Sequence, residues 1–223
     1  MQMKKGKKES KEEKKVEKKE NNQEKQVKLF IFGMVALIIL IVLAYFLIQG
    51  DKKFEYAGLE FQKGKVGDLT LYFIKIPLNS ITGEVVGYAS SYVSEDPRKL
   101  TNIPINTQLM LKKEVALAAD SKFVEKCEDS ILAATRLSVY LKNTGINPVA
   151  ATLNKKEAEE LNRNYVNCSA DSDYSIIAFE TAEKDEIAKE NNCYKVNVAN
   201  CNVMNVTERL MIGVYAHSRG IVI

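Results

Sequence analysis

The sequence predicts an α/β (or α+β) protein: a single transmembrane helix, a β-hairpin region and a small, mainly parallel βαβ-type extracytoplasmic domain. Three observations carry this prediction. Residues 29–48 form one uncharged apolar run, β-branched and aromatic runs dominate residues 54–111, and strand-like and helix-like patterns alternate over residues 112–223. The predicted parts are a tail at 1–28, a span at 29–49 and a globular domain at 50–223.

The tail, residues 1–28, carries eleven Lys and six Glu, a net charge of +5. After Met3 its aliphatic residues are Val16 and Val27, too little apolar surface for a core, so the tail is predicted to be disordered. The whole chain has a net charge of +3, so the other residues sum to −2. A nearly neutral domain gives no electrostatic reason to expect nucleic acid as a partner.

The apolar run Leu29–Ile48 contains no charge and no proline. At about 1.5 Å per residue it reaches roughly 30 Å, the thickness of a bilayer's hydrocarbon core. We therefore expect the lipid bilayer to be a partner through residues 29–49. The basic excess lies on the N-terminal side, which predicts a cytoplasmic N-terminus and a domain outside the cell membrane. A cleaved signal peptide is the main alternative, but small residues fit a cleavage site poorly at Ala44–Phe46.

The region that follows the span, residues 54–111, is predicted to be β-rich. Residues 69–76 and 84–93 favour strands, and the residues between them include Pro77, Asn79 and Gly83. This pattern is typical of a hairpin.

From residue 112 onward the pattern predicts alternating strands and helices. A helical face runs from Cys127 to Leu141 at spacings of three and four residues, and Gly145 and Pro148 end it. The other predicted elements are strands at 115–119, 149–153, 174–179 and 194–198, a polar helix at 155–164 and a last helix at 206–217. The alternation indicates βαβ units and a mainly parallel sheet.

All four cysteines lie beyond the span, which is typical of an oxidising compartment and two disulfides. In a parallel sheet, Cys127 and Cys201 lie near the C-terminal edge of the strands, and Cys168 and Cys193 near the opposite edge. Eight extended residues, about 26 Å, separate Cys193 from Cys201, beyond disulfide reach. We therefore predict the pairs Cys127–Cys201 and Cys168–Cys193. The alternative is a reactive thiol at Cys127, near a helix N-terminus.

Asn167 and Asn205 each begin an N-glycosylation sequon, which makes them candidate glycosylation sites. Asn205 has an alternative role. With Glu208 three residues later it forms a capping-box pattern for the last helix.

Few residues favour catalysis. His217 is the one histidine, and its predicted place in the last helical turn suits a cation that complements the helix dipole. No Gly-x-Ser-x-Gly, Walker A, Gly-x-Gly-x-x-Gly or Cys-x-x-Cys motif occurs, and no paired zinc-ligand spacing. Asp171 and Asp173 form an Asp-x-Asp pattern that resembles the metal and nucleotide-sugar site of glycosyltransferases, but their surroundings also read as a turn.

A ligand of a parallel sheet is expected at the C-terminal edge of the strands. The candidate residues there are Asp120, Ser121, Asn200 and Asn202. No cofactor or metal is expected.

Two functional hypotheses follow. The first is a non-enzymatic, membrane-anchored module that binds a protein partner or takes part in an envelope assembly. The alternative is an extracytoplasmic enzyme, either a thiol-redox protein using Cys127 or a metal-dependent transferase using Asp171 and Asp173.

Overall fold

The computed structural model describes residues 28–45, 53–79, 84–169 and 172–223. The chain divides into two compact units, Met1–Asp51 and Lys52–Ile223. In the first unit, Lys28–Tyr45 is a helix with exposed side chains, long and apolar enough to cross a membrane. The predicted N-terminal apolar helix is therefore present. The predicted disordered tail, except Lys28, and residues 46–49 of the predicted span lie outside the described residues.

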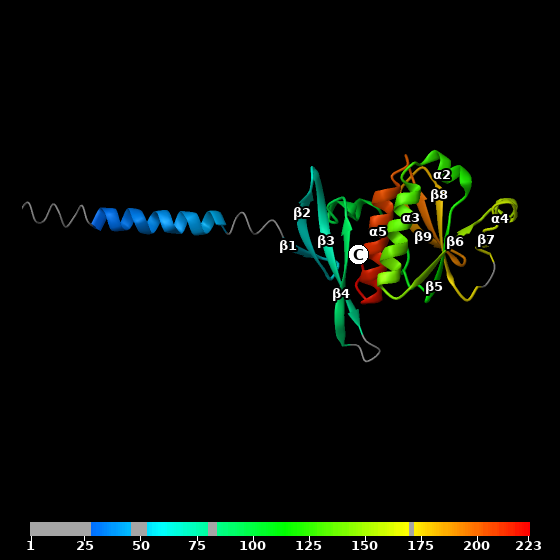
Figure 1. The fold of residues 1–223 in the computed structure, drawn as a ribbon, viewed down its shortest axis with the longest axis horizontal. Helices are drawn as coiled ribbons and strands as arrows, with labels where there is room; N and C mark the ends of the chain where they lie inside the picture. The colour runs from blue at the N-terminus through cyan, green and yellow to red at the C-terminus, as the bar shows by residue number, and fades with distance from the viewer. Residues whose placement is uncertain (1–27, 46–52, 80–83, 170–171) are drawn as a thin grey trace, which may run out of the picture. The chain divides into compact units, whose positions relative to one another are not determined.

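The second unit contains two β-sheets with helices between them (Figure 1). One buried hydrophobic cluster includes residues of both sheets and of the helices α3 (Ser130–Asn143) and α5 (Val203–Ser218). Because both sheets bury a face against the same helices, α5 is buried almost all round, from Val203 to Ala216.

The first sheet is an antiparallel meander in the order β1-β2-β3-β4. Its strands are β1 (Lys53–Tyr56), β2 (Leu59–Val66), β3 (Leu69–Asn79) and β4 (Val85–Val93). The predicted hairpin is present as β3 and β4, but β3 continues through Pro77 and Asn79, which were expected in the loop. Proline is tolerated there because the ladder between β2 and β3 ends at Ile74, so no strand needs an N–H from Pro77 on that side.

The second sheet has the order β7-β6-β5-β8-β10-β9. Its strands are β5 (Glu114–Ala118), β6 (Asn147–Thr152), β7 (Asn164–Tyr165), β8 (Ser175–Thr181), β9 (Glu186–Glu190) and β10 (Cys193–Val198). Four neighbouring pairs are parallel and the β9–β10 pair is antiparallel, so the sheet is of mixed orientation. The sequence analysis missed β9, because an edge strand with charged residues lacks the apolar run of a buried one.

The shorter helices are η1 (Lys99–Asn102), α2 (Ser121–Lys126) and α4 (Lys155–Leu161). The prediction of a β-rich region up to residue 111 is wrong beyond β4, where η1 and irregular segments run along α5. Gly213 of α5 permits this close approach, since a Cβ there would lie 2.6 Å from the Ile105 Cδ1 atom. Helix α5 also begins earlier than predicted, at Val203, with Asn202 as its N-cap residue, so Asn205 and Glu208 form no capping box.

Candidate functional site

Both disulfides lie in the half of the unit that contains the six-stranded sheet. Cys127 follows α2 and is bonded to Cys201, which follows β10; their Cα atoms are 5.2 Å apart. Cys168 is bonded to Cys193 at the start of β10. These are the pairs that the sequence analysis predicts. One bridge lies at each end of β10, as expected for strands that run in parallel.

Two of the predicted ligand-edge residues, Asp120 and Ser121, form hydrogen bonds at the start of α2. The Asp120 carboxylate caps α2 and accepts a hydrogen bond from the Phe123 N–H at 2.7 Å. The Ser121 N–H donates to Glu157 Oε2 at 3.0 Å. The side chain of Glu157 is buried, and Arg163 lies 3.8 Å from its other oxygen. These interactions hold the start of α2 against α4.

The other two ligand-edge residues lie at the end of β10. Asn200 is exposed and has a φ of 49°, a left-handed conformation that asparagine tolerates. Asn202 donates to Asp185 Oδ2 at 2.7 Å and accepts from the Asn205 side-chain amide at 2.8 Å. Asp185 also accepts from the Ala199 N–H. The structure thus forms two separate polar groups along this edge.

A cavity of about 390 Å³ opens at the C-terminal ends of β5 and β8, where the strand order reverses. Ligands of open α/β sheets bind at this position. The cavity is lined by Asp120, Lys122, Phe123, Lys126, Leu153, Phe179, Glu180 and Thr181. Asp120 is the one predicted ligand-edge residue in the lining. Its carboxylate caps α2, and Glu180 lies 3.3 Å from the Lys195 ammonium, so both acids already have partners.

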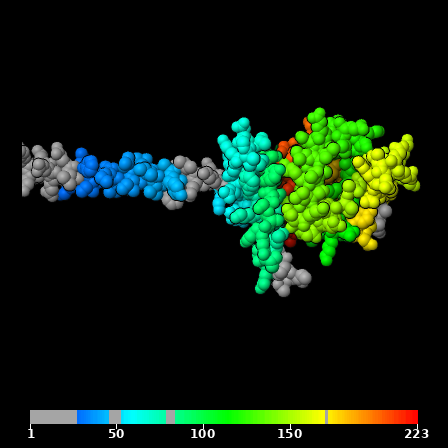
Figure 2. Space-filling view, viewed as in Figure 1, coloured from blue at the N-terminus to red at the C-terminus, as the bar shows by residue number. Residues whose placement is uncertain are grey.

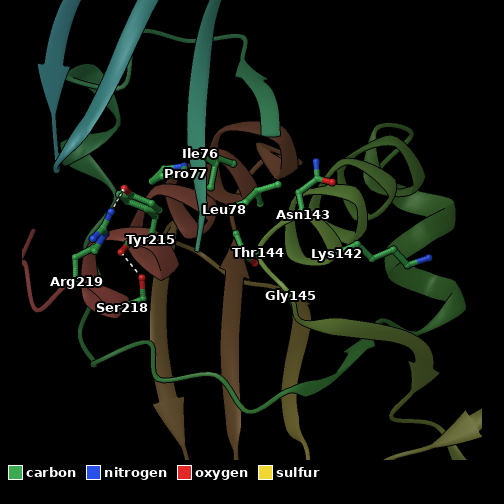
Figure 3. A pocket seen from close by; sticks show the side chains of 10 residues that line it. All are labelled: Ile76, Pro77, Leu78, Lys142, Asn143, Thr144, Gly145, Tyr215, Ser218 and Arg219. Atoms are coloured by element: carbon green, nitrogen blue, oxygen red, sulfur yellow. Dashed lines mark hydrogen bonds between the residues drawn. The ribbon is translucent and has the colours of Figure 1, made fainter. Parts of the chain in front are cut away.

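A second cavity, of about 570 Å³, lies between β3 and the C-terminal ends of α3 and α5 (Figure 3). Ile76, Pro77 and Leu78 form one wall, and Tyr215 and Arg219 lie on the other side. The Tyr215 hydroxyl accepts a hydrogen bond from Arg219 at 3.3 Å. The part of β3 that extends past its pairing with β2 therefore lies beside the C-terminal ends of α3 and α5.

The two sequons differ in accessibility. Asn167 is exposed, and its side-chain oxygen accepts a bond from the Ser169 N–H at 3.0 Å. Asn205 lies inside α5, and the hydroxyl-bearing Thr207 of its sequon is fully buried. Asn167 is therefore the accessible candidate for glycosylation in the folded chain.

The residues considered for catalysis are Cys127, Asp171 and Asp173, and the structure describes the first and the last of them. Cys127 is bonded to Cys201, so the structure holds no thiol at that position. Asp171 lies outside the described residues, and Asp173 is exposed. Within the described ranges, no group of three or more His, Cys, Asp or Glu side chains is placed to hold a metal ion.

His217 lies in the last turn of α5 as predicted, but its role differs from the expected cation. Its Nδ1 atom accepts a hydrogen bond from the Leu109 N–H at 2.9 Å, which requires an unprotonated nitrogen. Burial, and then the nearby Arg209 guanidinium, lower the pKa of His217 below its usual value. Neutral His217 therefore anchors the segment before β5 on α5.

The face of the four-stranded sheet opposite the helices is exposed and carries apolar side chains among polar ones such as Gln62 and Lys75. Alternate residues of β2, β3 and β4 point to this face, and we call it the outer face. Its exposed apolar residues are Val66, Leu69, Phe73, Val86, Tyr88 and Tyr92. Phe73 and Tyr92 face each other across the strands with ring centroids 6.3 Å apart, and the Arg136 guanidinium lies over the Tyr92 ring at 4.5 Å.

The four sheet margins differ in length and charge. The edge strand β1 has four residues including Lys53 and Glu55, β7 has two, and β9 carries charged residues at both ends, Glu186 and Glu190. Edge strand β4 has nine residues, VVGYASSYV, with no charge and no proline. Among the described residues, no strand pairs with its free side. Short or charged edges resist pairing with other chains. β4 is long and has no charge of its own, and Arg136 of α3 covers its C-terminal end, where the guanidinium donates to the Tyr92 carbonyl at 2.8 Å.

Sequence reasoning missed the buried carboxylate that joins β4 to the helices. Glu208 of α5 accepts hydrogen bonds from the Ser94 N–H at 2.7 Å, the Ser94 hydroxyl at 2.6 Å and the Glu95 N–H at 3.2 Å. The Arg136 guanidinium of α3 lies 3.0 Å away. Nothing local in the sequence marks this role, because the partners lie more than 70 residues earlier in the chain.

The chain was compared with models of protein families, with curated proteins and with solved structures, and no match was found. The geometry of the chain itself therefore carries the functional argument.

Proposed function

We propose that the chain is a membrane-anchored extracytoplasmic binding or envelope-assembly module, and that β4 with the adjoining outer face is its docking surface. The observation that carries the proposal is the nine-residue edge strand β4, which contains no charged residue and whose side chains Tyr88 and Tyr92 are exposed. The N-terminal apolar helix and the two disulfides support the anchoring and the oxidising compartment.

An exposed edge strand offers a row of backbone donors and acceptors to an incoming strand, which supplies affinity. Alternate side chains of that strand then lie over the outer face, beside Tyr88, Tyr92 and Phe73. In the space-filling view the β3–β4 hairpin projects from the rest of the compact unit, so a partner has access to it (Figure 2).

The occupant is an extended, uncharged segment of another envelope protein, rich in β-branched and aromatic residues. A lysine or arginine placed opposite Ser90 would lose hydration without gaining an ion pair, because β4 carries no charge and the neighbouring Lys75 of β3 is itself basic. A neutral segment of about six residues matches the part of the edge from Val85 to Ser91, ahead of the Tyr92 carbonyl that Arg136 already bonds.

Photo-crosslinking in native membranes tests the proposal. A benzoylphenylalanine at Tyr88 should yield a discrete adduct whose partner peptide is an uncharged extended segment, and the same probe at Lys189 of β9 should not. Ser90→Lys should reduce the adduct about five-fold, since one unfavourable charge at a strand pair costs about 1 kcal/mol. Equal adducts from both edges, or no effect of Ser90→Lys, would contradict the docking surface.

The same membranes decide between partners and test the orientation. Differently tagged copies identify an adduct between two copies of this chain, which would replace the proposed partner. Protease added to sealed right-side-out vesicles should remove residues 53–223 and leave a small tail-plus-helix fragment. Protection of the large unit would refute an outer location.

A further inference from the structure

The cavity of about 570 Å³ between β3 and the C-terminal ends of α3 and α5 carries charge of one sign. Among the described residues that line it, Lys142 and Arg219 are basic and none is acidic. Its volume lies within the range of small-molecule sites, about 300–1,000 Å³. Because cations that line a concave surface raise the local concentration of anions, the cavity favours an anionic ligand.

The two cations are not used to cap the helices. The last carbonyl groups of α3 accept hydrogen bonds from the N–H groups that follow the helix and from the Thr144 hydroxyl. Those of α5 accept in the same way from the following N–H groups and from the Ser218 hydroxyl. Within the described ranges, no helix carbonyl accepts from the side chain of Lys142 or Arg219. The helix dipoles favour cations here, yet the donor groups of these cations remain available to a ligand.

Tyr215 holds the Arg219 guanidinium at one end of the cavity. The guanidinium donates to the Tyr215 hydroxyl at 3.3 Å, and its central carbon lies 5.6 Å from the centroid of the Tyr215 ring. Tyr215 is buried, so its ring is a fixed support. Its hydroxyl accepts in this bond, and among the described residues its proton has no acceptor. The remaining guanidinium N–H groups and this O–H form a set of donors that suits the two oxygens of a carboxylate.

The opposite wall of the cavity suits an apolar group. Ile76 and Leu78 lie on the part of β3 that extends past its pairing with β2, and buried Ile76 marks the face that packs toward the helices. Residues two apart in a strand share a face, so Leu78 turns the same way. Figure 3 shows Leu78 across the cavity from Tyr215 and Arg219. A ligand that reaches both walls therefore has a charged end and an apolar end.

The second cation, Lys142, takes no part in this donor set. Its ammonium points away from the other side chains that line the cavity (Figure 3). Lys142 is exposed, as Arg219 is, and it carries the same charge at the same cavity. It is therefore a matched control for Arg219.

We propose that this cavity binds a small organic carboxylate. The carboxylate is held by the Arg219 guanidinium and the Tyr215 hydroxyl, and the apolar group of the ligand packs against Ile76 and Leu78. A single guanidinium balances one negative charge, and its fork matches the two oxygens of a carboxylate. The site contains no residue of β4, so it stands or falls independently of the proposed docking surface.

Fluorine NMR of a small probe tests the site. The full chain is placed in lipid nanodiscs and titrated with 4-fluorophenylacetate, and empty nanodiscs correct for partition into lipid. We expect the probe signal to broaden with the chain present, and the neutral analogue 4-fluorophenylacetamide to bind at least about ten-fold more weakly. Equal binding of the acid and the amide, or no broadening by the acid, would overturn the site. Displacement of the acid by an equal concentration of inorganic phosphate would overturn the assignment to a carboxylate.

Three variants locate the binding. Arg219→Gln should weaken binding of 4-fluorophenylacetate about ten-fold, and Tyr215→Phe, which keeps the ring, about five-fold. Lys142→Gln should change it less than about two-fold. Melting temperatures close to that of the unaltered chain show that each variant is folded. Equal losses in Arg219→Gln and Lys142→Gln would mean a general attraction of anions and would overturn the site.

Discussion

The six-stranded and four-stranded sheets share one layer of helices but differ in how they are held and bounded. Both disulfides connect parts of the six-stranded half, and its two edge strands are short or charged. The four-stranded sheet has no disulfide and ends in the uncharged edge β4. In the proposed function, the six-stranded sheet serves as the scaffold and the four-stranded sheet presents surfaces to other molecules.

The largest expected effect tests the covalent half of this comparison. Replacing Cys127 and Cys201 together with serine should lower the free energy of unfolding by about 4 kcal/mol, because that bridge constrains a long loop of the unfolded chain. The pair Cys168 and Cys193, which closes 25 rather than 74 residues, should cost about 3.5 kcal/mol. Urea unfolding of the full chain in detergent measures both. The reverse order would mean that native-state contacts outweigh loop entropy here.

The next effect concerns the junction between the sheets. Glu208→Ala should destabilise the fold by about 3 kcal/mol, because Arg136 then loses its buried counter-charge and the Ser94 backbone loses an acceptor. Glu208→Gln keeps an acceptor and should cost less. Hydrogen exchange adds a regional readout: amides of β4 should lose more protection than those of β8. Uniform loss across both sheets would show that the two are one cooperative unit.

The smallest effect is a pH dependence at the contact between Leu109 and α5. Since the pKa of His217 is lower in the folded chain than its ordinary 6.5, the unfolded chain binds the proton more strongly. Stability should therefore fall as pH drops below about 6.5 and level off below the folded pKa. His217→Gln should flatten the melting temperature across this window. An unchanged slope in that variant would assign the pH dependence to other groups.

The sequence predicted the parts of the fold that depend on local pattern and chain order. The apolar helix, the strands β3, β5, β8 and β10, and the two cysteine pairs follow from apolar runs and from the edges that parallel strands share. Strand β9 was missed because Ile187 and Ala188, its apolar residues, form too short a run between charges. The region after β4 was predicted to be β-rich but contains η1 and irregular segments. These errors occur where tertiary pairing decides the structure.

The candidate docking surface was beyond sequence reasoning for a related reason. The residues of β4 look like those of any half-buried strand, and its status as an edge depends on which strands pair elsewhere in the chain. The buried charge of Glu208 depends in the same way on Ser94 and Arg136. Of the predicted ligand-edge residues, Asp120 lines a cavity, Ser121 and Asn202 donate hydrogen bonds to neighbouring carboxylates, and Asn200 is exposed, so a ligand there stays a prediction.

The burial of α5 between the two sheets has a consequence for biogenesis. Synthesis runs from the N-terminus, so the four strands of the first sheet emerge long before the helix that covers their inner face. Leu59, Phe61 and Ile74 remain without their final packing partners until residues 203–218 have been made. The nascent chain therefore carries an exposed apolar sheet while residues 94–202 are being made, and the cell must shield that surface until the last helix docks.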